Sequence, residues 1–301
     1  MSSSIHIIPS AEIDAIRWDN CVADNSGLIY STYHYLTTMA DNWHGIVIDD
    51  YNAVMALPWR KKWGIKYIYT PPFMQQLGLI GDVSDINKVV SQLYKSCSYY
   101  TYNLNFNNQS LISLIPFTEH TNLVLSLSES APELQSNYSK SLTRNLQKAR
   151  NNGVLVSEGN YKETVDWYQQ YQGNKIMHVS QNDYLHLKEL LSRLSDNNQL
   201  ICKNALNKNG DIIATIACIK DHNRIYNLLP SSSEEGKDLS AMHVLLNHII
   251  TEYAGSNMLF DFEGSDIKGV QQFYQQYGSF NQPYYRIHQN NLPIPIKWFK
   301  K

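Results

Sequence analysis

Apolar and polar positions in the first half of the chain follow the pattern of a run of strands. WHGIVI at 43–48 and AVMALPW at 53–59 flank the turn DDYN, which predicts two strands joined as a hairpin. KYIYT at 66–70 predicts a third strand, which two prolines stop. DINKVVSQLYKSC at 85–97 has helical spacing and leads into the β-forming run YYTYNLNF at 99–106.

The second half of the chain repeats this order. QLICKNAL at 199–206 and IIATIACI at 212–219 predict a second hairpin around the turn NKNGD, and RIYNLL at 224–229 predicts the strand after it. A helical pattern at 239–254 and the strand MLFDF at 258–262 complete the copy. Because both the order and the spacing are kept, the pattern indicates two copies of one β-rich α/β unit.

The two copies are connected by a long helical pattern, ELQSNYSKSLTRNLQKARNNGV at 133–154, which NNG stops. The preceding stretch SLSESAPE combines small, acidic and proline residues, so we place the domain boundary near residue 130. The first unit then spans residues 1–130. Residues 131–301 hold the connector helix and the second unit, which is the candidate for catalysis.

The overall charge is nearly balanced. The 301 residues include 25 Lys and Arg against 27 Asp and Glu, a formal net charge of −2 at pH 7, which gives no global electrostatic reason to expect DNA or an anionic membrane as partner. Any anion site is therefore expected to be local. The cysteines are scattered, the start has no signal-peptide pattern and no apolar run approaches a membrane span, which together predict a cytoplasmic protein without a membrane span.

Three stretches carry a resemblance to a known family. SKSLTRNLQKARNNGV at 139–154 resembles the basic helix that precedes the second unit in FemAB-like members of the GNAT N-acyltransferase superfamily. FDFEGSDIKGVQQFYQQYGSF at 260–280 resembles their strand ending in DF-x-G with its following helix, and YIYTPPFMQQLG at 67–78 resembles a binding-loop segment. The resemblance implies an α/β (α+β) fold of two tandem GNAT-like units with mixed, mostly antiparallel sheets.

The resemblance also implies a reaction, the transfer of an acyl group from an acyl-CoA thioester to an amine. Such a reaction needs a base for the attacking ammonium and an acid for the leaving group, placed where two parallel strands splay apart. Asp261 and Glu263 follow the predicted strand and are candidates for the base, and Tyr274 in FYQQYGSF matches the family's proton donor. The two carboxylates could instead cap the next helix, and Tyr274 could be a buried core tyrosine.

The residues that would hold the acyl donor are less typical of the family. A coenzyme A diphosphate normally lies on a loop of the form [RQ]-x-x-G-x-[GA] at a helix start, whereas SSSEEGKDLSAM at 231–242 has two acids and a single glycine there. Asp238 or Ser240 could simply cap the helix. The residues assigned to donor binding are Leu228, Leu229, Ser231, Ser232, Lys237 and Ser240.

Substrate contacts are predicted at two further places. Lys140, Arg144 and Lys148 recur every four residues and form one stripe on the connector helix, either for the phosphates of a substrate or as a solvated basic face. No inserted coiled coil is present, so we rank tRNA below acyl-CoA as a partner. His243 and His248 are spaced five apart and indicate no metal site. The residues assigned to substrate binding are Gln75, Gln76, Arg144, Lys148 and Tyr226.

The sequence thus predicts a GNAT-like acyltransferase acting on a small-molecule or peptide amine, without a metal and without DNA as a partner. Two alternatives remain open. One is FemAB-like transfer of an aminoacyl or peptidyl group to a peptidoglycan precursor. The other is a non-catalytic binding protein of the same fold, which the absent diphosphate loop favours.

Overall fold

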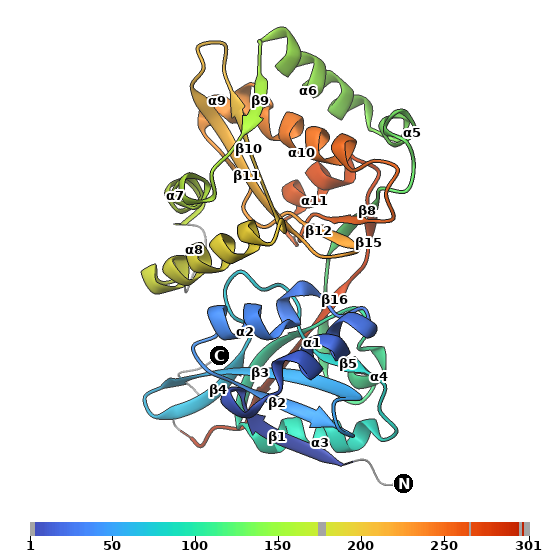
Figure 1. The fold of residues 1–301 in the computed structure, drawn as a ribbon, viewed down its shortest axis with the longest axis vertical. Helices are drawn as coiled ribbons and strands as arrows, with labels where there is room; N and C mark the ends of the chain where they lie inside the picture. Colours follow the sequence, from blue (N-terminus) through green and yellow to red (C-terminus); the bar gives the residue numbers. More distant parts are fainter. Residues whose placement is uncertain (1–3, 174–178, 265, 295–296, 298–301) are drawn as a thin grey trace. The chain divides into compact units, whose positions relative to one another are not determined.

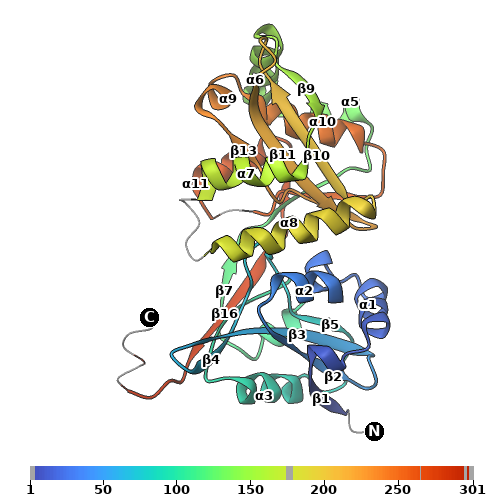
Figure 2. The same cartoon turned by 60° about the vertical axis from the view of Figure 1, so that its left-hand side comes forward.

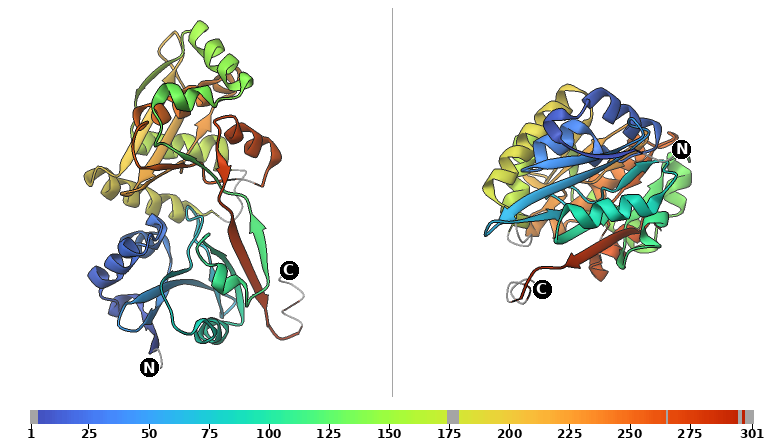
Figure 3. Two further views of the ribbon diagram at one scale, coloured as in Figure 1. Left: turned by 90° about the vertical axis from the view of Figure 1, so that its right-hand side faces the viewer. Right: turned by 90° about the horizontal axis from the view of Figure 1, so that it is seen from below.

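The chain forms two compact units. The computed structural model describes residues 4–173, 179–264, 266–294 and 297, and Figure 1 traces them. The first unit comprises Met1–His120 and Pro283–Lys301, and the second comprises Thr121–Gln282. The division between the units therefore falls after His120, about ten residues before the boundary predicted near residue 130. The segment from Pro283 onward belongs to the first unit. The reason is β16 (Tyr284–Asn290), which pairs with strands of the first unit (Figure 3).

The first unit is built on one mixed sheet. Within the described residues its strand order is β1-β2-β3-β4-β6-β16-β7, with β5 paired to β3, and only β4 and β6 run parallel among these named strands. Its elements are β1 (Ile5–Pro9), η1 (Ser10–Glu12), α1 (Ala15–Asp24), η2 (Ile29–Ser31), α2 (Tyr33–Met39), β2 (Trp43–Ile48), β3 (Ala53–Lys62), β4 (Ile65–Tyr69), β5 (Leu79–Gly81), α3 (Ile86–Ser96), β6 (Tyr99–Leu104), α4 (Gln109–Ile112), β7 (Phe117–His120) and β16.

The parallel pair of the first unit is closed by the chain itself. Beyond Tyr69, the segment that follows β4 returns to β6, where Leu77 forms a parallel bridge with Leu104. The Leu77 N–H donates to the Asn103 carbonyl (2.9 Å), and the Leu77 carbonyl accepts from the Asn105 N–H (2.8 Å). Leu77 is fully buried, so this pair of strands does not open into a splay.

The second unit repeats the arrangement. Within the described residues its strand order is β15-β8-β14-β12-β11-β10-β9, with β13 paired to β11, and β12 and β14 form the parallel pair. Its elements are β8 (Leu123–Ser126), α5 (Ala131–Ser136), α6 (Lys140–Asn151), β9 (Leu155–Glu158), α7 (Tyr161–Gln172), α8 (Gln181–Asp196), β10 (Leu200–Leu206), β11 (Ile212–Lys220), β12 (Arg224–Tyr226), β13 (Ser231–Ser232), α9 (Glu234–Asp238), α10 (Ala241–Glu252), β14 (Leu259–Asp261), α11 (Lys268–Gln275) and β15 (Phe280–Asn281).

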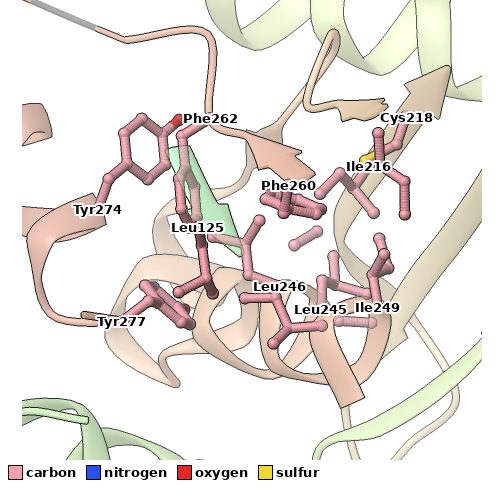
Figure 4. Close-up of a cluster of buried hydrophobic side chains, with 14 of the residues drawn as sticks. Leu125, Ile216, Cys218, Leu245, Leu246, Ile249, Phe260, Phe262, Tyr274 and Tyr277 are labelled. Atoms are coloured by element: carbon pink, nitrogen blue, oxygen red, sulfur yellow. The ribbon is translucent and has the colours of Figure 1, made fainter. Parts of the chain in front are cut away.

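Helices cover both faces of the second sheet (Figure 2). Ile216 and Cys218 of β11 lie in the core beneath α10, with Leu245, Ile249 and Phe260 (Figure 4). Side chains alternate along a strand, so the intervening residues of β11 belong to the opposite face, and α7 packs against β11 and β13 there. The mixed α/β fold with two mostly antiparallel sheets, predicted from the repeat and the resemblance, is confirmed.

Two predicted elements differ from the structure in their extent. The helix predicted over 133–154 is two helices, α5 and α6, because Ser139 starts a new helix by accepting the Leu142 N–H on its hydroxyl (3.1 Å). The strand predicted over 224–229 ends at Tyr226. The Asn227 N–H makes the last hydrogen bond to β14, and Leu228 then leaves the ladder before Leu229 pairs with β11. The second difference creates the candidate site.

A first prediction concerns Gly236, the single glycine of the loop that replaces the family's diphosphate motif. A Cβ on Gly236 would lie 2.1 Å from the backbone carbonyl oxygen of Ile213, so the glycine lets α9 pack on β11. We expect Gly236→Ala to lower the free energy of unfolding by about 1–3 kcal/mol or more, measured in urea. Gly269→Ala on α11 is the control, because nothing lies within 4 Å of its added Cβ. Equal stability of the two variants would contradict a packing role for Gly236.

Candidate active site

The candidate site lies where β12 and β14 separate. The two strands are parallel from Arg224 opposite Leu259 to Tyr226 opposite Asp261, and the Asn227 N–H still donates to the Asp261 carbonyl (2.9 Å). Beyond this point the strands have different partners. Leu229 exchanges two hydrogen bonds with Ala217 of β11, while the Phe262 N–H donates to the Leu123 carbonyl beside β8 (2.9 Å). The pair therefore opens into a splay at its carboxyl end.

The chain turns sharply as it leaves β14. Glu263 has a left-handed backbone (φ 54°), and its N–H donates to Oδ1 of Asp261 (2.8 Å). Gly264 follows with φ 36°, and a Cβ there would lie 2.2 Å from the Thr121 carbonyl oxygen. A left-handed backbone at a residue other than glycine persists only where its surroundings fix it, so these contacts hold Glu263 in one place.

Asp261 has a second role in this turn. Its Oδ2 accepts from Nη1 of Arg224 (2.5 Å) and from Nδ2 of Asn122 (3.2 Å), and the Asp261 and Arg224 side chains are 1% and 4% exposed. Nη2 of Arg224 donates in turn to Oε1 of Gln282 (2.8 Å). The Asp261 carboxylate is thus engaged in a buried ion pair. Of the two carboxylates predicted as the base, Glu263 is the half-buried one at the splay.

Tyr274 reaches the same point from α11. Its ring stacks on Phe262, with centroids 4.7 Å apart (Figure 4), and its hydroxyl accepts from Nδ2 of Asn227 (3.2 Å). Burial raises the pKa of Tyr274 well above its usual value, and the negative charge of Glu263 raises it further. The phenol is therefore protonated at neutral pH, as a proton donor must be.

Two site residues were missed at the sequence level. Tyr168 of α7 is half-buried, and its pKa is raised by burial first and then by the charge of Glu263. Asn227 is 2% exposed, and its Oδ1 has no hydrogen-bond partner among the residues that the structure describes. A signal for Asn227 existed, since it is the single amide within the apolar strand RIYNLL. Tyr168 gave none, because it stands outside the stretches that resemble the family.

The residues predicted to bind the donor line the strand after the splay but are largely covered. Leu228 and Leu229 are buried, and the Ser231 hydroxyl donates to the Trp167 carbonyl of α7 (3.3 Å). Ser232 is 8% exposed, and by the alternation of an antiparallel pair its N–H is directed away from β11. Tyr226, predicted to contact substrate, is fully buried, and its hydroxyl donates to Asp221 (2.6 Å).

The loop at α9 does not form a diphosphate cradle. Lys237 pairs with Glu234 (2.5 Å), so its charge is neutralised within the helix. The Ser233 hydroxyl caps α9, accepting from the Gly236 N–H (3.0 Å). Ser240 is buried in a left-handed conformation at the start of α10 and makes no side-chain cap hydrogen bond. With Glu235 also in the first turn, these residues do not fit a bound coenzyme A diphosphate.

The remaining predicted substrate residues lie apart from this cluster in the chain. Gln76 of the first unit is fully buried, and its Nε2 donates to Oε1 of Gln75 (2.5 Å). Arg144 and Lys148 are exposed on α6, whose buried positions are Leu142 and Ala149. A role of these four polar residues in substrate binding stays a prediction.

Other reactive side chains of the second unit are held in unreactive states. Burial raises the pKa of Cys202 to about 12 and that of Cys218 well above its usual value, so neither is a thiolate at neutral pH. Burial also lowers the pKa of His243 to about 4. Among the described residues, no three His, Cys, Asp or Glu side chains are grouped as metal ligands. Nor does that part of the chain contain a helix long and apolar enough to cross a membrane.

Known proteins share this fold. Residues 136–273 match the model of the acetyltransferase (GNAT) domain. Among solved structures, FemX is similar over 100% of both chains (TM-score 0.67, 10% identity), and L-PGS from Bacillus licheniformis over 95% of both (TM-score 0.56, 13% identity). A tandem GNAT protein from the clavulanic acid biosynthesis pathway matches over 96% of this chain and 99% of its own (TM-score 0.56, 9% identity). No curated protein matches the sequence.

The match and the fold identify the class. Residues 136–273 match the GNAT domain, and the chain as a whole has the duplicated fold that FemX and the tandem GNAT protein also have. At these identities the solved structures show the fold, and the domain match supports acyl transfer as the general class of reaction.

Proposed function

We propose that the second unit transfers an acyl group from an activated ester or thioester to an amine, with the acyl carbonyl at the splay between β12 and β14. The observation that carries this proposal is that Glu263 and Tyr274 both lie at the open end of the parallel strands, where Glu263 follows β14 and Tyr274 bonds Asn227 of the splay. The carboxylate is close enough for its charge to raise the pKa of the phenol, which is fully buried and protonated.

The two side chains supply complementary steps. Glu263 takes a proton from the ammonium of the acceptor, and the free amine attacks the acyl carbonyl. As the tetrahedral intermediate collapses, the bond to the leaving sulfur or oxygen breaks, and Tyr274 donates its proton to that atom. The nitrogen of the new amide loses its second proton to water. The raised pKa of Tyr274 favours return of the first proton from Glu263 to the phenolate, directly or through water, so that both groups are restored.

The splay also explains why the second unit, rather than the first, is the catalytic candidate. In the first unit Leu77 closes the corresponding pair of strands through hydrogen bonds to both Asn103 and Asn105. In the second unit Asn227 makes the last bond of the ladder, and a buried side-chain atom there lacks a partner. The strands of the second pair part beyond this bond, so the second splay is the candidate place for the acyl donor.

The identity of the donor separates two versions of this function. Acyl-CoA is the donor that the sequence resemblance implies, and the acceptor is then a small-molecule or peptide amine. The misfit of α9 to a diphosphate favours the second version, transfer of an aminoacyl or peptidyl group to a peptidoglycan precursor. The exposed Lys140, Arg144 and Lys148 would support it by contacting the phosphates of a charged tRNA.

Thermal unfolding of the full chain tests the donor. A ligand at a hundred times its Kd stabilises the folded chain by about 2.7 kcal/mol, which is a readily measured shift. We expect a saturable rise of the unfolding temperature with acyl-CoA or with an aminoacylated tRNA, and no change with buffer alone. If no donor of either class shifts the transition, the third alternative, a non-catalytic binding protein, replaces the proposal.

Asn227, whose amide oxygen lacks a partner among the described residues, gives a further prediction. One of its two polar atoms holds the Tyr274 hydroxyl, and the other is available to the acceptor nitrogen or to the donor. We expect Asn227→Leu to lower kcat/KM about tenfold, the equivalent of about one lost hydrogen bond. Asn145→Leu is the matched control, because the Asn145 side chain on α6 contacts His243 of α10 (3.2 Å) rather than a residue of the splay. A loss of the same size in both variants would remove Asn227 from the site.

A further inference from the structure

The hairpin of β3 and β4 projects from the first unit. β2 pairs with β3 only as far as Trp43 opposite Pro58, whereas β3 continues to Lys62 and pairs there with β4 alone. The last part of the hairpin is therefore a two-stranded ribbon, visible as the light blue loop beside the β4 label in Figures 1 and 2. A ribbon without further strands contributes little to the sheet, so its residues are free to serve another purpose.

The tip of this hairpin carries an exposed tryptophan in an unfavourable conformation. Lys62 pairs with Ile65, and the two residues between them, Trp63 and Gly64, have φ of 53° and 76°. Both angles are positive, as in the type I′ turn, in which asparagine is strongly preferred at the first position. Trp63 occupies that position and is 74% exposed. A bulky aromatic residue here lowers the stability of the turn, and most of its indole ring stays in water.

Three lysines, Lys61, Lys62 and Lys66, lie beside the turn, and two of them face one another. Lys61 lies directly opposite Lys66 in the register of the hairpin, and like charges in that arrangement are destabilising. Burial lowers the pKa of Lys66, and the charge of Lys61 adds to the lowering. Among the described residues, no carboxylate forms an ion pair with Lys61, Lys62 or Lys66. The ribbon is thus locally cationic in a chain whose net charge is −2.

Both features weaken the isolated hairpin, and both are relieved by the same surroundings. An interface that takes the indole out of water and places anions beside the lysines compensates for the strained turn and for the repulsion. We propose that the hairpin tip, Lys61 to Lys66, docks on the surface of an anionic phospholipid bilayer. Trp63 enters the headgroup region, where indole rings are favoured, and the lysines bind lipid phosphates.

A lipid surface fits these observations better than a nucleic acid. Non-specific binding of a single strand uses several aromatic rings along a basic groove, so that successive bases stack on them. The tip offers one exposed ring, Trp63, and the ring of Trp59 is already covered by the Lys66 ammonium, 4.7 Å from its centroid. A single indole at the apex of a cationic ribbon matches a planar anionic surface.

Two substitutions separate lipid binding from folding, because each is expected to improve the hairpin. Trp63→Asn places the preferred residue in the turn, and Lys61→Glu converts the repulsive pair with Lys66 into an attractive one. We expect the full chain to sediment with vesicles of phosphatidylcholine mixed with phosphatidylglycerol, less so at high salt and not with phosphatidylcholine alone. Each variant should lower the partition coefficient about tenfold or more while its unfolding transition stays in place or rises.

Matched controls lie elsewhere on the described surface. Ile16→Asn removes an equally exposed apolar side chain, 74% accessible on α1, and Lys140→Glu reverses an exposed charge on α6. A second charge reversal, Lys208→Glu, changes an exposed lysine in the turn between β10 and β11 that has no proposed part in the binding of phosphates. All three controls should bind vesicles as the unmodified chain does. The proposal is overturned if the unmodified chain does not bind the mixed vesicles, if Trp63→Asn and Lys61→Glu bind them unchanged, or if the tip substitutions weaken binding to a single-stranded RNA and not to vesicles.

Discussion

Tyr274→Phe lowers kcat by about 10² or more, because the variant has no proton to give to the leaving group. The effect on folding is expected to be small. The ring keeps its stacking on Phe262, and the loss of one hydrogen bond with Asn227 costs about 1 kcal/mol in the free energy of unfolding. Steady-state kinetics with a saturating donor, together with urea unfolding, measures both quantities on the same preparation.

Tyr277→Phe is the control for this experiment. Tyr277 lies in the same buried cluster as Tyr274, and burial likewise raises its pKa well above the usual value. Its hydroxyl, however, donates to the His243 carbonyl (3.3 Å) rather than bonding Asn227 at the splay. We expect similar stability for the two variants and near-normal kcat for Tyr277→Phe. Equal kcat values in the two variants would exclude Tyr274 as the acid.

Glu263→Gln lowers the rate at neutral pH by about 10² or more, since the acceptor ammonium then loses its proton to water. The dependence on pH also changes. In the unmodified protein the rate falls towards acidic pH as the carboxylate is protonated. In the variant this titration is absent, and the rate rises with pH in proportion to the free amine. The difference between the two proteins is therefore expected to narrow as the pH approaches the pKa of the amine.

The control for Glu263 is Glu252→Gln on α10. Glu252 is exposed and lies 3.3 Å from the buried Lys203, which keeps a second ion pair with Glu158 (2.7 Å) when Glu252 is replaced. Its pH profile should match that of the unmodified chain. An unchanged profile for Glu263→Gln would mean that the residue only shapes the turn after β14, and the base would have to be sought elsewhere in the splay.

The strands and the repeat could be predicted from the sequence because their signals are local. The predicted strand over 43–48 has the same bounds as β2. The predicted strands over 199–206 and 212–219 differ from β10 and β11 by single residues at their ends. The candidate acid and base were also within reach, since Glu263 and Tyr274 stand in a contiguous stretch that resembles the family. Their closeness across the splay follows from β14 and α11 being sequential elements.

Long-range pairing lay beyond local signals. β16 joins the first unit through hydrogen bonds to β6 and β7, and nothing in YYRIHQN states which sheet it completes. The role of Asp261 depended on Arg224, which is distant in sequence and meets it only after β12 and β14 have paired. The position of Asn227 at the splay could be predicted only by knowing where the hydrogen bonds between β12 and β14 end. The role of a buried polar side chain depends on the backbone groups around it, which the local sequence does not reveal.

Mass-spectrometric detection of an N-acylated amine is the most direct test of acyl transfer at the splay between β12 and β14. The full chain is incubated with a mixture of small-molecule and peptide amines and, in separate reactions, with acyl-CoA or with aminoacylated tRNA. We expect a product with one of these donors, formed at a normal rate by Tyr277→Phe and about a hundredfold more slowly by Tyr274→Phe. No product with either donor, or a product formed equally fast by both variants, would contradict acyl transfer at this splay.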